Sequence, residues 1–284
     1  MMPITHCRLC LSKVTVQLSL SPAPIDNGHP DNSGPYSIKY PLDLAECPSC
    51  GHVQLGFSIP GDTLFADYKY RTPESERSRL RDYAELLKHL YPFALSADRP
   101  KVLEIGSNNG MFVDCLRAVG FFAVGIDPCG PQNGMPRWFS SKSAKNLVFS
   151  MGKMKLIVAN NVFAHVDDLR NVFVGIAKLL DDDGVVVFEV PYFPNMVERG
   201  GFDMVRHEHK DYHTLSPLPR FLAKFGLCIR QYEHNNAHGG SIRVHCSRGD
   251  KGVAVPEDRV HWDTIAKKYA EYQKDSFSIH ALTT

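Results

Sequence analysis

Residues 101–127, KVLEIGSNNGMFVDCLRAVGFFAVGID, constrain the fold more than any other stretch of the chain. Residues 102–105 form a short β-rich run that a glycine- and asparagine-rich turn, residues 106–110, interrupts. Apolar residues then recur at helical spacing until Gly120, and residues 121–126 are typical of a second strand. Strand, glycine turn, helix and strand in this order predict a parallel βαβ unit.

The turn between the first strand and the helix has the features of a ligand site. Small residues let a ligand approach the backbone, where the free N–H groups of the helix N-terminus point toward it. Asp127 ends the second strand, and its carboxylate could accept hydrogen bonds from a ribose diol. The turn is not GxGxxG and no GKS or GKT follows, which disfavours a dinucleotide fold and a P-loop.

The turn and the strand end together match a known pattern. Glu104, Gly106 and Gly110 form E-x-G-x-x-x-G, and Asp127 closes the next strand. This arrangement resembles the S-adenosylmethionine site of class I methyltransferases. A βα turn of an α/β domain that binds nothing is the alternative interpretation.

Composition and charge exclude several classes of function. The 284 residues suffice for one large or two modest domains, and 43% hydrophobic with 22% charged residues is ordinary for a soluble protein. A formal net charge of +1 gives no electrostatic reason to expect nucleic acid or an anionic membrane as partner. The sequence shows no apolar run of about 18 residues and no signal peptide pattern, so we expect a cytoplasmic protein.

Two CxxC pairs mark the N-terminal region, Cys7 with Cys10 and Cys47 with Cys50. Two turns that each offer two thiolates suit a tetrahedral zinc ion with four cysteine ligands. The intervening stretch is longer than the ~15–20 residues usual in such motifs, and its polar middle, residues 21–35, predicts a surface loop. Two matched pairs disfavour a redox CxxC, and a cytosolic chain disfavours disulfides. We therefore predict structural zinc that takes no part in the chemistry.

The region that follows the zinc motif predicts one more helix and one irregular stretch. Residues 73–90 are typical of a charged helix with Thr72 or Ser75 as its cap. Residues 128–151 are rich in proline and glycine at their start, and we expect no regular structure there.

Strands and helices then alternate. The sequence predicts a strand at 155–160, an amphipathic helix at 169–180, a turn at 181–184 and a nearly unbroken β-rich strand at 185–190. A buried parallel strand has this apolar character, and the alternation predicts a doubly wound α/β sheet.

Polar residues follow the first of these strands. Asn160 and Asn161 end it at the edge where ligands bind in such sheets, and His165 is expected over the same crevice. A histidine that caps a helix or fills a gap in the core is an equal alternative for His165.

The densest polar cluster is RHEHKDYH, residues 206–213. Four groups of this cluster, Glu208 and the histidines His207, His209 and His213, can take or give a proton near neutral pH or hold a residue that does. His209 and His213 are spaced i, i+4, but HEH is not HExxH and no third ligand is evident, which disfavours a catalytic metal. A solvated charged loop is the simpler alternative. Beyond it the sequence predicts a helix at 218–227, a turn into a strand at 238–244, and a helix from residue 257 onward.

Taken in order, the motifs resemble one family, the zinc-containing C-methyltransferases of deoxysugar biosynthesis, which methylate C3 of a nucleotide-linked 4-keto sugar. The segments that carry the resemblance are CxxC…CPSCG, LFADYKYR, VLEIGSNNG, GIDP, VANNVFAHVDDL, FEVPY, HEHKDYHTLSPL and HGGSIRV. They span most of residues 7–246.

This resemblance implies a zinc-binding domain at 1–72, a Rossmann-like class I methyltransferase domain at 73–250, and the start of a C-terminal domain or a tail helix at 251–284. It implies that His209 is the general base, that Glu208 orients it, and that Tyr70 and His165 line the sugar pocket. An extended backbone would turn Glu208 away from His209; if the backbone bends there, the nearby carboxylate would raise the pKa of His209. The residues implied to hold S-adenosylmethionine are Glu104, Gly106, Ser107, Asn108, Gly110, Asp127, Asn160 and Asn161.

The chain departs from the family pattern in three places. Arg206 stands where the family usually has a tyrosine, and residues 128–152 form a shorter segment than usual. Thr284 ends the chain where the family's C-terminal domain would be beginning, as expected for a fragment or for a relative that has lost that domain.

Two other functions are compatible with these residues. An O- or N-methyltransferase could use the same donor, with Arg206 recognising an acidic substrate. The chain could also be a catalytically inactive module that binds zinc and the donor and docks a partner. The intact set of Glu104, Gly106, Gly110 and Asp127 argues against such decay.

Overall fold

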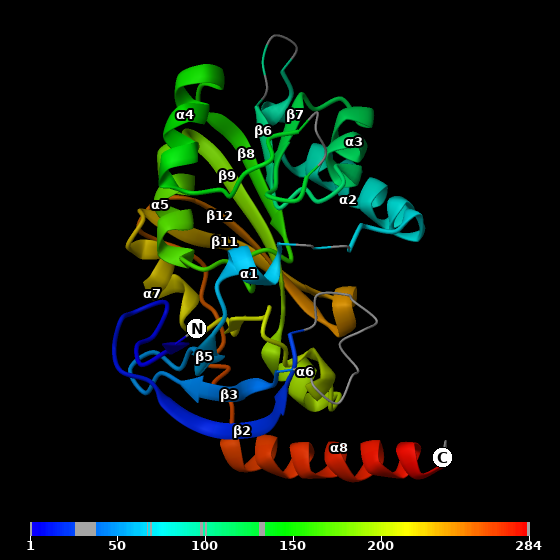
Figure 1. The fold of residues 1–284 in the computed structure, drawn as a ribbon. Coiled ribbons are helices and arrows are strands. Elements are labelled where there is room, and N and C mark those ends of the chain that lie inside the picture. Colours follow the sequence, from blue (N-terminus) through cyan, green and yellow to red (C-terminus); the bar gives the residue numbers. More distant parts are fainter. Residues whose placement is uncertain are drawn as a thin grey trace.

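A six-stranded mixed sheet forms the centre of the computed structural model, which describes residues 2–25, 38–66, 68, 70–96, 99, 101–130 and 134–282. Its strand order is β11-β12-β9-β8-β6-β7 (Figure 1). The parallel strands are β6 (Val102–Ile105), β7 (Ala123–Ile126), β8 (Met154–Asn160) and β9 (Leu180–Pro191). The antiparallel strands are β11 (Leu227–Asn235) and β12 (Ser241–Arg248). The predicted βαβ unit and the α/β class are confirmed.

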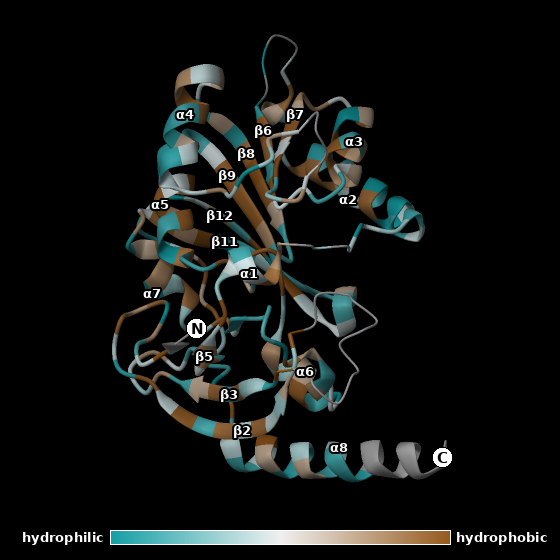
Figure 2. Ribbon diagram, in the orientation of Figure 1, coloured by the Kyte–Doolittle hydropathy of each residue, from teal (hydrophilic) through white to brown (hydrophobic). Residues whose placement is uncertain are grey.

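Helices cover both faces of this sheet. One face carries α2 (Arg77–Leu90) and α3 (Met111–Ala118), and the other carries α4 (Ser141–Met151), α5 (Leu169–Leu179) and α7 (Leu218–Ala223). In β8, Leu156 and Val158 belong to the core beneath α2 and α3, whereas Ile157 and Ala159 belong to the core beneath α4, α5 and α7. Side chains alternate along a strand, so a strand buried on both faces is apolar throughout, as Figure 2 shows for the central strands. In the described part of the chain, no helix has both the length and the apolar character that a membrane span requires.

A four-stranded antiparallel sheet, in the order β10-β4-β3-β2, forms the N-terminal lobe. Its strands are β2 (Thr15–Ala23), β3 (Tyr40–Glu46), β4 (Val53–Leu55) and β10 (Asp211–Tyr212). The lobe core also contains side chains of α6 (Phe193–Glu198) and of α8 (Trp262–Leu282), which runs along β2 in Figure 1. The lobe therefore takes in chain beyond residues 1–72, and β10 comes from the polar cluster 206–213.

Short elements complete the fold. A small β1 (Met2–Pro3) pairs with β5 (Phe57–Ser58), and α1 (Gly61–Leu64) follows. Single 3₁₀ turns lie at Glu74–Glu76, Pro92–Ala94, Phe202–Met204 and Ala237–Gly239.

The prediction of irregular chain across residues 128–151 was wrong, because α4 occupies Ser141–Met151. Ser140 caps this helix by accepting from the backbone N–H of Ser143, whose hydroxyl in turn accepts from the Ser140 N–H. Ala144 and Leu147 then face the core. A capping box followed by core residues three apart is the signal that the prediction missed.

Smaller corrections concern the ends of elements. The predicted side-chain caps of α2, Thr72 and Ser75, are absent, because a 3₁₀ turn leads into the helix. The predicted turn 181–184 lies inside β9, and the helix predicted at 218–227 ends at Ala223. Of the loop predicted at 21–35, residues 21–23 belong to β2 and residues 26–35 lie outside the described residues.

Candidate active site

A cavity of about 430 Å³ lies at the carboxyl ends of β6, β7 and β8. Ligands bind at this edge of doubly wound sheets. Every residue that the sequence implied for the donor or for catalysis lines the cavity except Gly110. These residues are Glu104, Gly106, Ser107, Asn108, Asp127, Asn160, Asn161, Tyr70, His165, Glu208 and His209.

The glycine turn shapes one wall. Gly106 has φ +73°, and a Cβ atom there would lie 2.3 Å from Cγ2 of Val162. Only glycine fits this position, because both the conformation and the space exclude a side chain. Gly110, with φ +83°, is the N-cap of α3.

Asp127 closes the turn from the neighbouring strand. Its Oδ2 accepts from the backbone N–H of Asn108 (2.9 Å), and its Oδ1 accepts from that of Cys129 (2.7 Å). Each carboxylate oxygen has a second lone pair, so the group can still accept from a ligand. The structure therefore places a fixed acceptor where the sequence predicted a contact to ribose.

Several buried polar atoms on this wall have no hydrogen-bond partner within the described part of the chain. They are Oε2 of Glu104, both side-chain amide atoms of Asn160, and Oδ1 of Asn161. Burial and the nearby charge of Asp127 raise the pKa of Glu104 well above its usual value. Because buried polar groups are nearly always paired, these atoms are suited to a polar ligand. The residues thus fit the amino acid and ribose groups of S-adenosylmethionine.

Two histidines, His165 and His209, also line the cavity and are here called the histidine wall. The ring centroids of His165 and His209 lie 4.8 Å apart, edge to face. Nδ1 of His165 is 3.0 Å from the carbonyl oxygen of Glu208, and Nδ1 of His209 is 2.8 Å from that of Met204. A carbonyl can only accept, so each Nδ1 carries the proton and each Nε2 keeps a lone pair.

The environment of His209 differs from the prediction. The group that orients the ring is the Met204 carbonyl rather than the carboxylate of Glu208. Burial lowers the pKa of His209 to about 4, and burial together with the neighbouring His209 ring lowers the pKa of His165 to about 3. The predicted rise in the His209 pKa was therefore wrong, and both rings are neutral at pH 7. The carboxylate of Glu208 lies 3.8 Å from the guanidinium of Arg206.

Aromatic rings border the same wall. Tyr68 contacts both Phe65 and Tyr70, with ring centroids 4.9 and 6.2 Å apart. Tyr70 is half exposed, whereas burial raises the pKa of the Tyr68 hydroxyl above its usual value. Sequence reasoning assigned Tyr70 to the sugar pocket but did not assign Tyr68 to the site.

Other lining residues were missed altogether. Arg79 reaches the cavity from α2, and His238 reaches it from the HGG turn, where its φ is +48°. Met204, whose carbonyl orients His209, carried no signal in the sequence. A non-glycine residue with positive φ in an HGG turn becomes informative only once the backbone is known.

Two histidines of the polar cluster lie outside the cavity. His207 contacts the carbonyl of Ala23 (3.0 Å), and His213 contacts that of Phe163 (3.2 Å). Among the described residues, only the four cysteines form a group of three or more metal-binding side chains.

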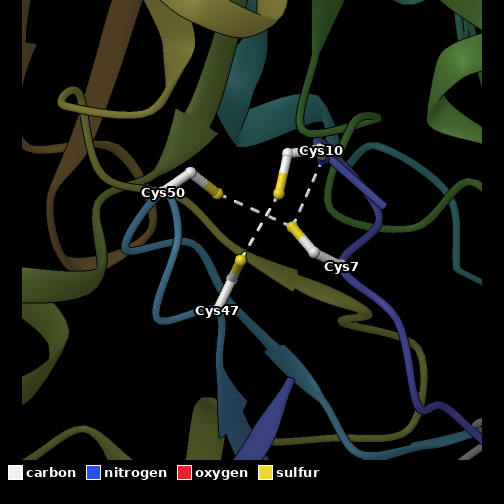
Figure 3. Close-up of side chains that lie close together, drawn as sticks. All are labelled: Cys7, Cys10, Cys47 and Cys50. Atoms are coloured by element: carbon white, nitrogen blue, oxygen red, sulfur yellow. Dashed lines mark hydrogen bonds between the residues drawn. The ribbon is translucent and has the colours of Figure 1, made fainter. Parts of the chain in front are cut away.

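The four cysteines converge as predicted (Figure 3). The sulfur atoms all lie within 4.8 Å of one another, with Cys7 and Cys50 3.7 Å apart and Cys10 and Cys47 3.4 Å apart. Four ligands at about 2.3 Å from one zinc ion would have sulfurs about 3.8 Å apart, so the donor set fits zinc. Leu9, between the first two cysteines, accepts at its carbonyl from Arg170 of α5 and from Lys224, just after α7. The site thus joins the N-terminal lobe to the central sheet and lies outside the cavity.

Comparisons with known proteins agree with this arrangement. The family model "Methyltransferase domain" matches residues 76–232, and the model "Putative zinc binding domain" matches residues 7–65. The C-methyltransferase NovU of Streptomyces niveus is 28% identical over 255 residues, which are 85% of this chain and 60% of that protein. The chain therefore spans about 60% of the length of this curated relative.

Solved structures with a similar course of the chain include two bacterial methyltransferases. An S-adenosylmethionine-dependent methyltransferase from Anabaena variabilis has a TM-score of 0.46 at 12% identity, covering 66% of this chain and 91% of that one. Magnesium protoporphyrin IX methyltransferase from Synechocystis has a TM-score of 0.43 at 11% identity, covering 64% of this chain and 90% of that one.

Proposed function

Since this chain belongs to the methyltransferase family, whose domain spans residues 76–232, we propose that it C-methylates a small keto compound using S-adenosylmethionine. The acceptor that we propose is a nucleotide-linked 4-keto deoxysugar. Support comes from the order of motifs in the sequence and from the similarity to a C-methyltransferase. The observation that carries the proposal is His209, a neutral buried imidazole that lines the same cavity as the residues implied for the donor.

The cavity residues implied for the donor bind S-adenosylmethionine and orient it. Asp127 would hold the ribose, while Glu104, Asn160 and Asn161 would bind the polar end of the donor with atoms that otherwise lack partners. When bound, S-adenosylmethionine supplies an electrophilic methyl group. Because methyl transfer is an in-line displacement, the main contribution of these residues is alignment.

The histidine wall moves the proton. A carbon next to a carbonyl becomes nucleophilic only after losing a proton, and Nε2 of His209 is the lone pair suited to accept it. The Met204 carbonyl holds the proton on Nδ1, so the ring has the correct tautomer before the acceptor arrives.

A pKa of about 4 makes His209 a weak base in the free protein. A negatively charged acceptor beside the ring would raise this pKa toward neutrality and strengthen the base. The cavity is also lined by Arg79, Arg206 and His238, cations or potential cations that suit phosphate groups. Both features favour a nucleotide sugar over a neutral ketone.

The test is product identification. The protein is incubated with carbon-13-methyl S-adenosylmethionine and a panel of nucleotide-linked 4-keto sugars, and NMR locates the labelled methyl group. We expect a methyl group bonded to a carbon next to the keto group. A label on oxygen or nitrogen, or no transfer to any keto sugar, would reject the proposal.

A matched pair of variants tests the base. His209→Asn should lower turnover roughly 10²–10⁴-fold, the usual range for a positioned base. His207→Asn serves as control, because His207 also contacts a backbone carbonyl but lies outside the cavity. Equal losses in the two variants would assign both histidines a structural role.

A further inference from the structure

Arg8 lies inside the zinc motif, between Cys7 and Cys10, yet its side chain points away from the sulfurs toward the central domain. Its Nε donates to both carboxylate oxygens of Asp211, at 2.9 and 3.0 Å. Its two terminal nitrogens donate to the carbonyls of Val166 and Asp167. One guanidinium group therefore joins the zinc motif, the polar cluster 206–213 and the turn after β8.

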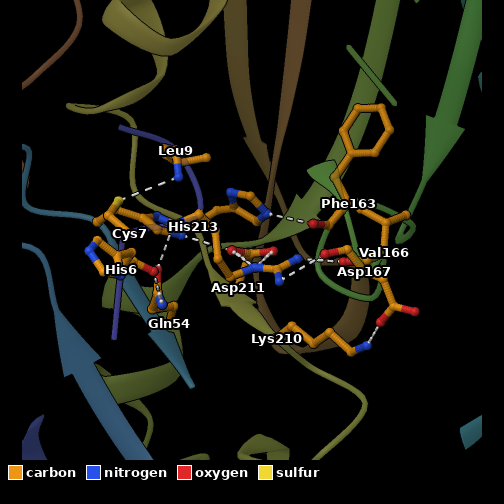
Figure 4. A network of polar contacts seen from close by, with 12 residues as sticks. His6, Cys7, Leu9, Gln54, Phe163, Val166, Asp167, Lys210, Asp211 and His213 are labelled. Atoms are coloured by element: carbon orange, nitrogen blue, oxygen red, sulfur yellow. Dashed lines mark hydrogen bonds and ion pairs between the residues drawn. The ribbon is translucent and has the colours of Figure 1, made fainter. Parts of the chain in front are cut away.

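Asp211 is the centre of this network (Figure 4). Its side chain is fully buried, and that of Arg8 is 11% exposed. His52, two residues after the last zinc cysteine, contributes a second contact, with Nε2 2.9 Å from Oδ1 of Asp211. Both partners of this carboxylate thus come from the two zinc-binding turns. A buried carboxylate with such partners has a single stable position, because losing either contact would leave a buried polar or charged group without a partner.

The same segment is fixed to the turn after β8 by further contacts. The backbone N–H of Lys210 donates to the carbonyl of Ala164 (2.6 Å), and the Lys210 ammonium pairs with Asp167. The carbonyl of Lys210 accepts from Leu55 of β4 (3.0 Å). Residue 210 is therefore held between the N-terminal lobe and the turn.

These fixed residues are direct neighbours of the two cavity histidines. His209 precedes Lys210, and His165 follows Ala164. The histidine rings contact each other, and His165 also bonds the carbonyl of Glu208. A shift of Asp211 or of the turn would consequently move one ring relative to the other.

We propose that Arg8 is a positioning residue for the reaction: it transmits the geometry of the zinc site through Asp211 and the 166–167 carbonyls to His209 and His165. The inference rests on the proposed function of His209 as the base. Zinc then acts on turnover without touching the cavity, by fixing the backbone from which Arg8 extends. The zinc motif is in this sense part of the active-site framework.

The test compares two arginine-to-lysine variants. Arg8→Lys keeps the charge and all four cysteines but loses the branched donor that reaches three acceptor groups at once. Arg248→Lys is the matched control, because Arg248 likewise donates to two backbone carbonyls, those of Ala177 (2.6 Å) and Leu180 (2.9 Å). These bonds join β12 to the junction of α5 and β9 and involve neither the zinc motif nor residues 206–213.

Four quantities are measured for each variant: bound zinc, donor affinity, steady-state kinetics and amide hydrogen exchange of residues 206–213. For Arg8→Lys we expect unchanged zinc and donor affinity, an acceptor KM within about twofold, and kcat lower by roughly 10- to 100-fold. We expect exchange in 206–213 to be faster by roughly tenfold. Arg248→Lys should leave both kcat and this exchange unchanged.

Asp211→Asn supplies a second perturbation that leaves the zinc motif untouched and preserves the side-chain shape. It should reproduce the loss of kcat and the faster exchange. Wild-type kcat and exchange in either folded variant, or equal effects in Arg248→Lys, would overturn the proposal. Exchange and donor binding need no turnover, so a wild-type protein without methyl transfer would refute the proposed function while the role of Arg8 is still judged by exchange.

Discussion

Replacing Asp127 tests the donor site most sharply, because the structure gives this carboxylate two separable tasks. It closes the βα turn by accepting from the N–H groups of Asn108 and Cys129, and it lines the cavity. Asp127→Ala removes both. The expected loss therefore combines a looser turn with a missing ligand contact.

The ligand contact can be estimated on its own. A hydrogen bond from a ribose hydroxyl to a charged acceptor contributes about 1.5–3 kcal/mol. This corresponds to roughly 10- to 150-fold in the dissociation constant. Loosening of the turn affects every ligand of the site, whereas the ribose contact affects only ligands that carry the hydroxyls.

Calorimetric titration of wild type and variant with S-adenosylhomocysteine and with its 2′,3′-dideoxy analogue separates the two effects. We expect Asp127→Ala to weaken binding of S-adenosylhomocysteine by roughly 10- to 150-fold and binding of the analogue by much less. Asp114→Ala is the control, because Asp114 is an exposed acid on the helix that follows the turn. An equal loss for both ligands would refute the ribose contact and leave only the turn.

Three further predictions address the zinc site, the glycine turn and acid stability. Protein purified without chelator should contain one zinc per chain, which Cys47→Ser should abolish; elemental analysis without zinc in the wild type would contradict the site. Gly106→Ala should weaken donor binding and should destabilise the protein more than Gly200→Ala does. Both glycines have positive φ, which costs about 1–2 kcal/mol for a residue with a side chain, but only at Gly106 would the added Cβ also clash with Val162. Equal unfolding midpoints for the two variants would show that the clash is relieved. Burial lowers the pKa of His209, His213 and His245 to about 4 each, so the stability that their neutral forms contribute is complete above about pH 6.5 and declines as the pH falls toward 4. Denaturant unfolding should show a loss on the order of 2 kcal/mol per histidine at pH 5, and equal stability at pH 7.5 and 5 would contradict this burial.

The central sheet was predictable because local pattern and global packing agree there. The apolar strand 185–190 is buried on both faces, and the glycine turn at residues 106–110 has glycine at two positions of positive φ, Gly106 and Gly110. The cysteine pairs were equally informative, since four thiolates with this spacing leave little choice but a shared metal. In these places a single physical requirement determines which residue types can occur.

The rest depends on contacts between distant residues. Met204 orients His209 through a backbone carbonyl, which any residue could supply, so the sequence gives no sign of it. The partner of Asp211, Arg8, lies about two hundred residues away in the chain, so nothing in the local sequence around Asp211 indicates it. Glu208 precedes His209 in sequence, but the contact of the His209 Nδ1 is with the carbonyl of Met204, five residues earlier.

The central claim is that His209 removes a proton from the carbon that is later methylated. The most direct measurement is exchange of that proton with solvent deuterium, in a nucleotide-linked 4-keto sugar, with S-adenosylhomocysteine bound so that no methyl transfer can occur. The account predicts exchange at the carbon next to the keto group in the wild type. It also predicts a loss of roughly 10²–10⁴-fold in His209→Asn at unchanged S-adenosylhomocysteine affinity. Exchange at the wild-type rate in His209→Asn, or methylation by a wild type that exchanges no such proton, would contradict it.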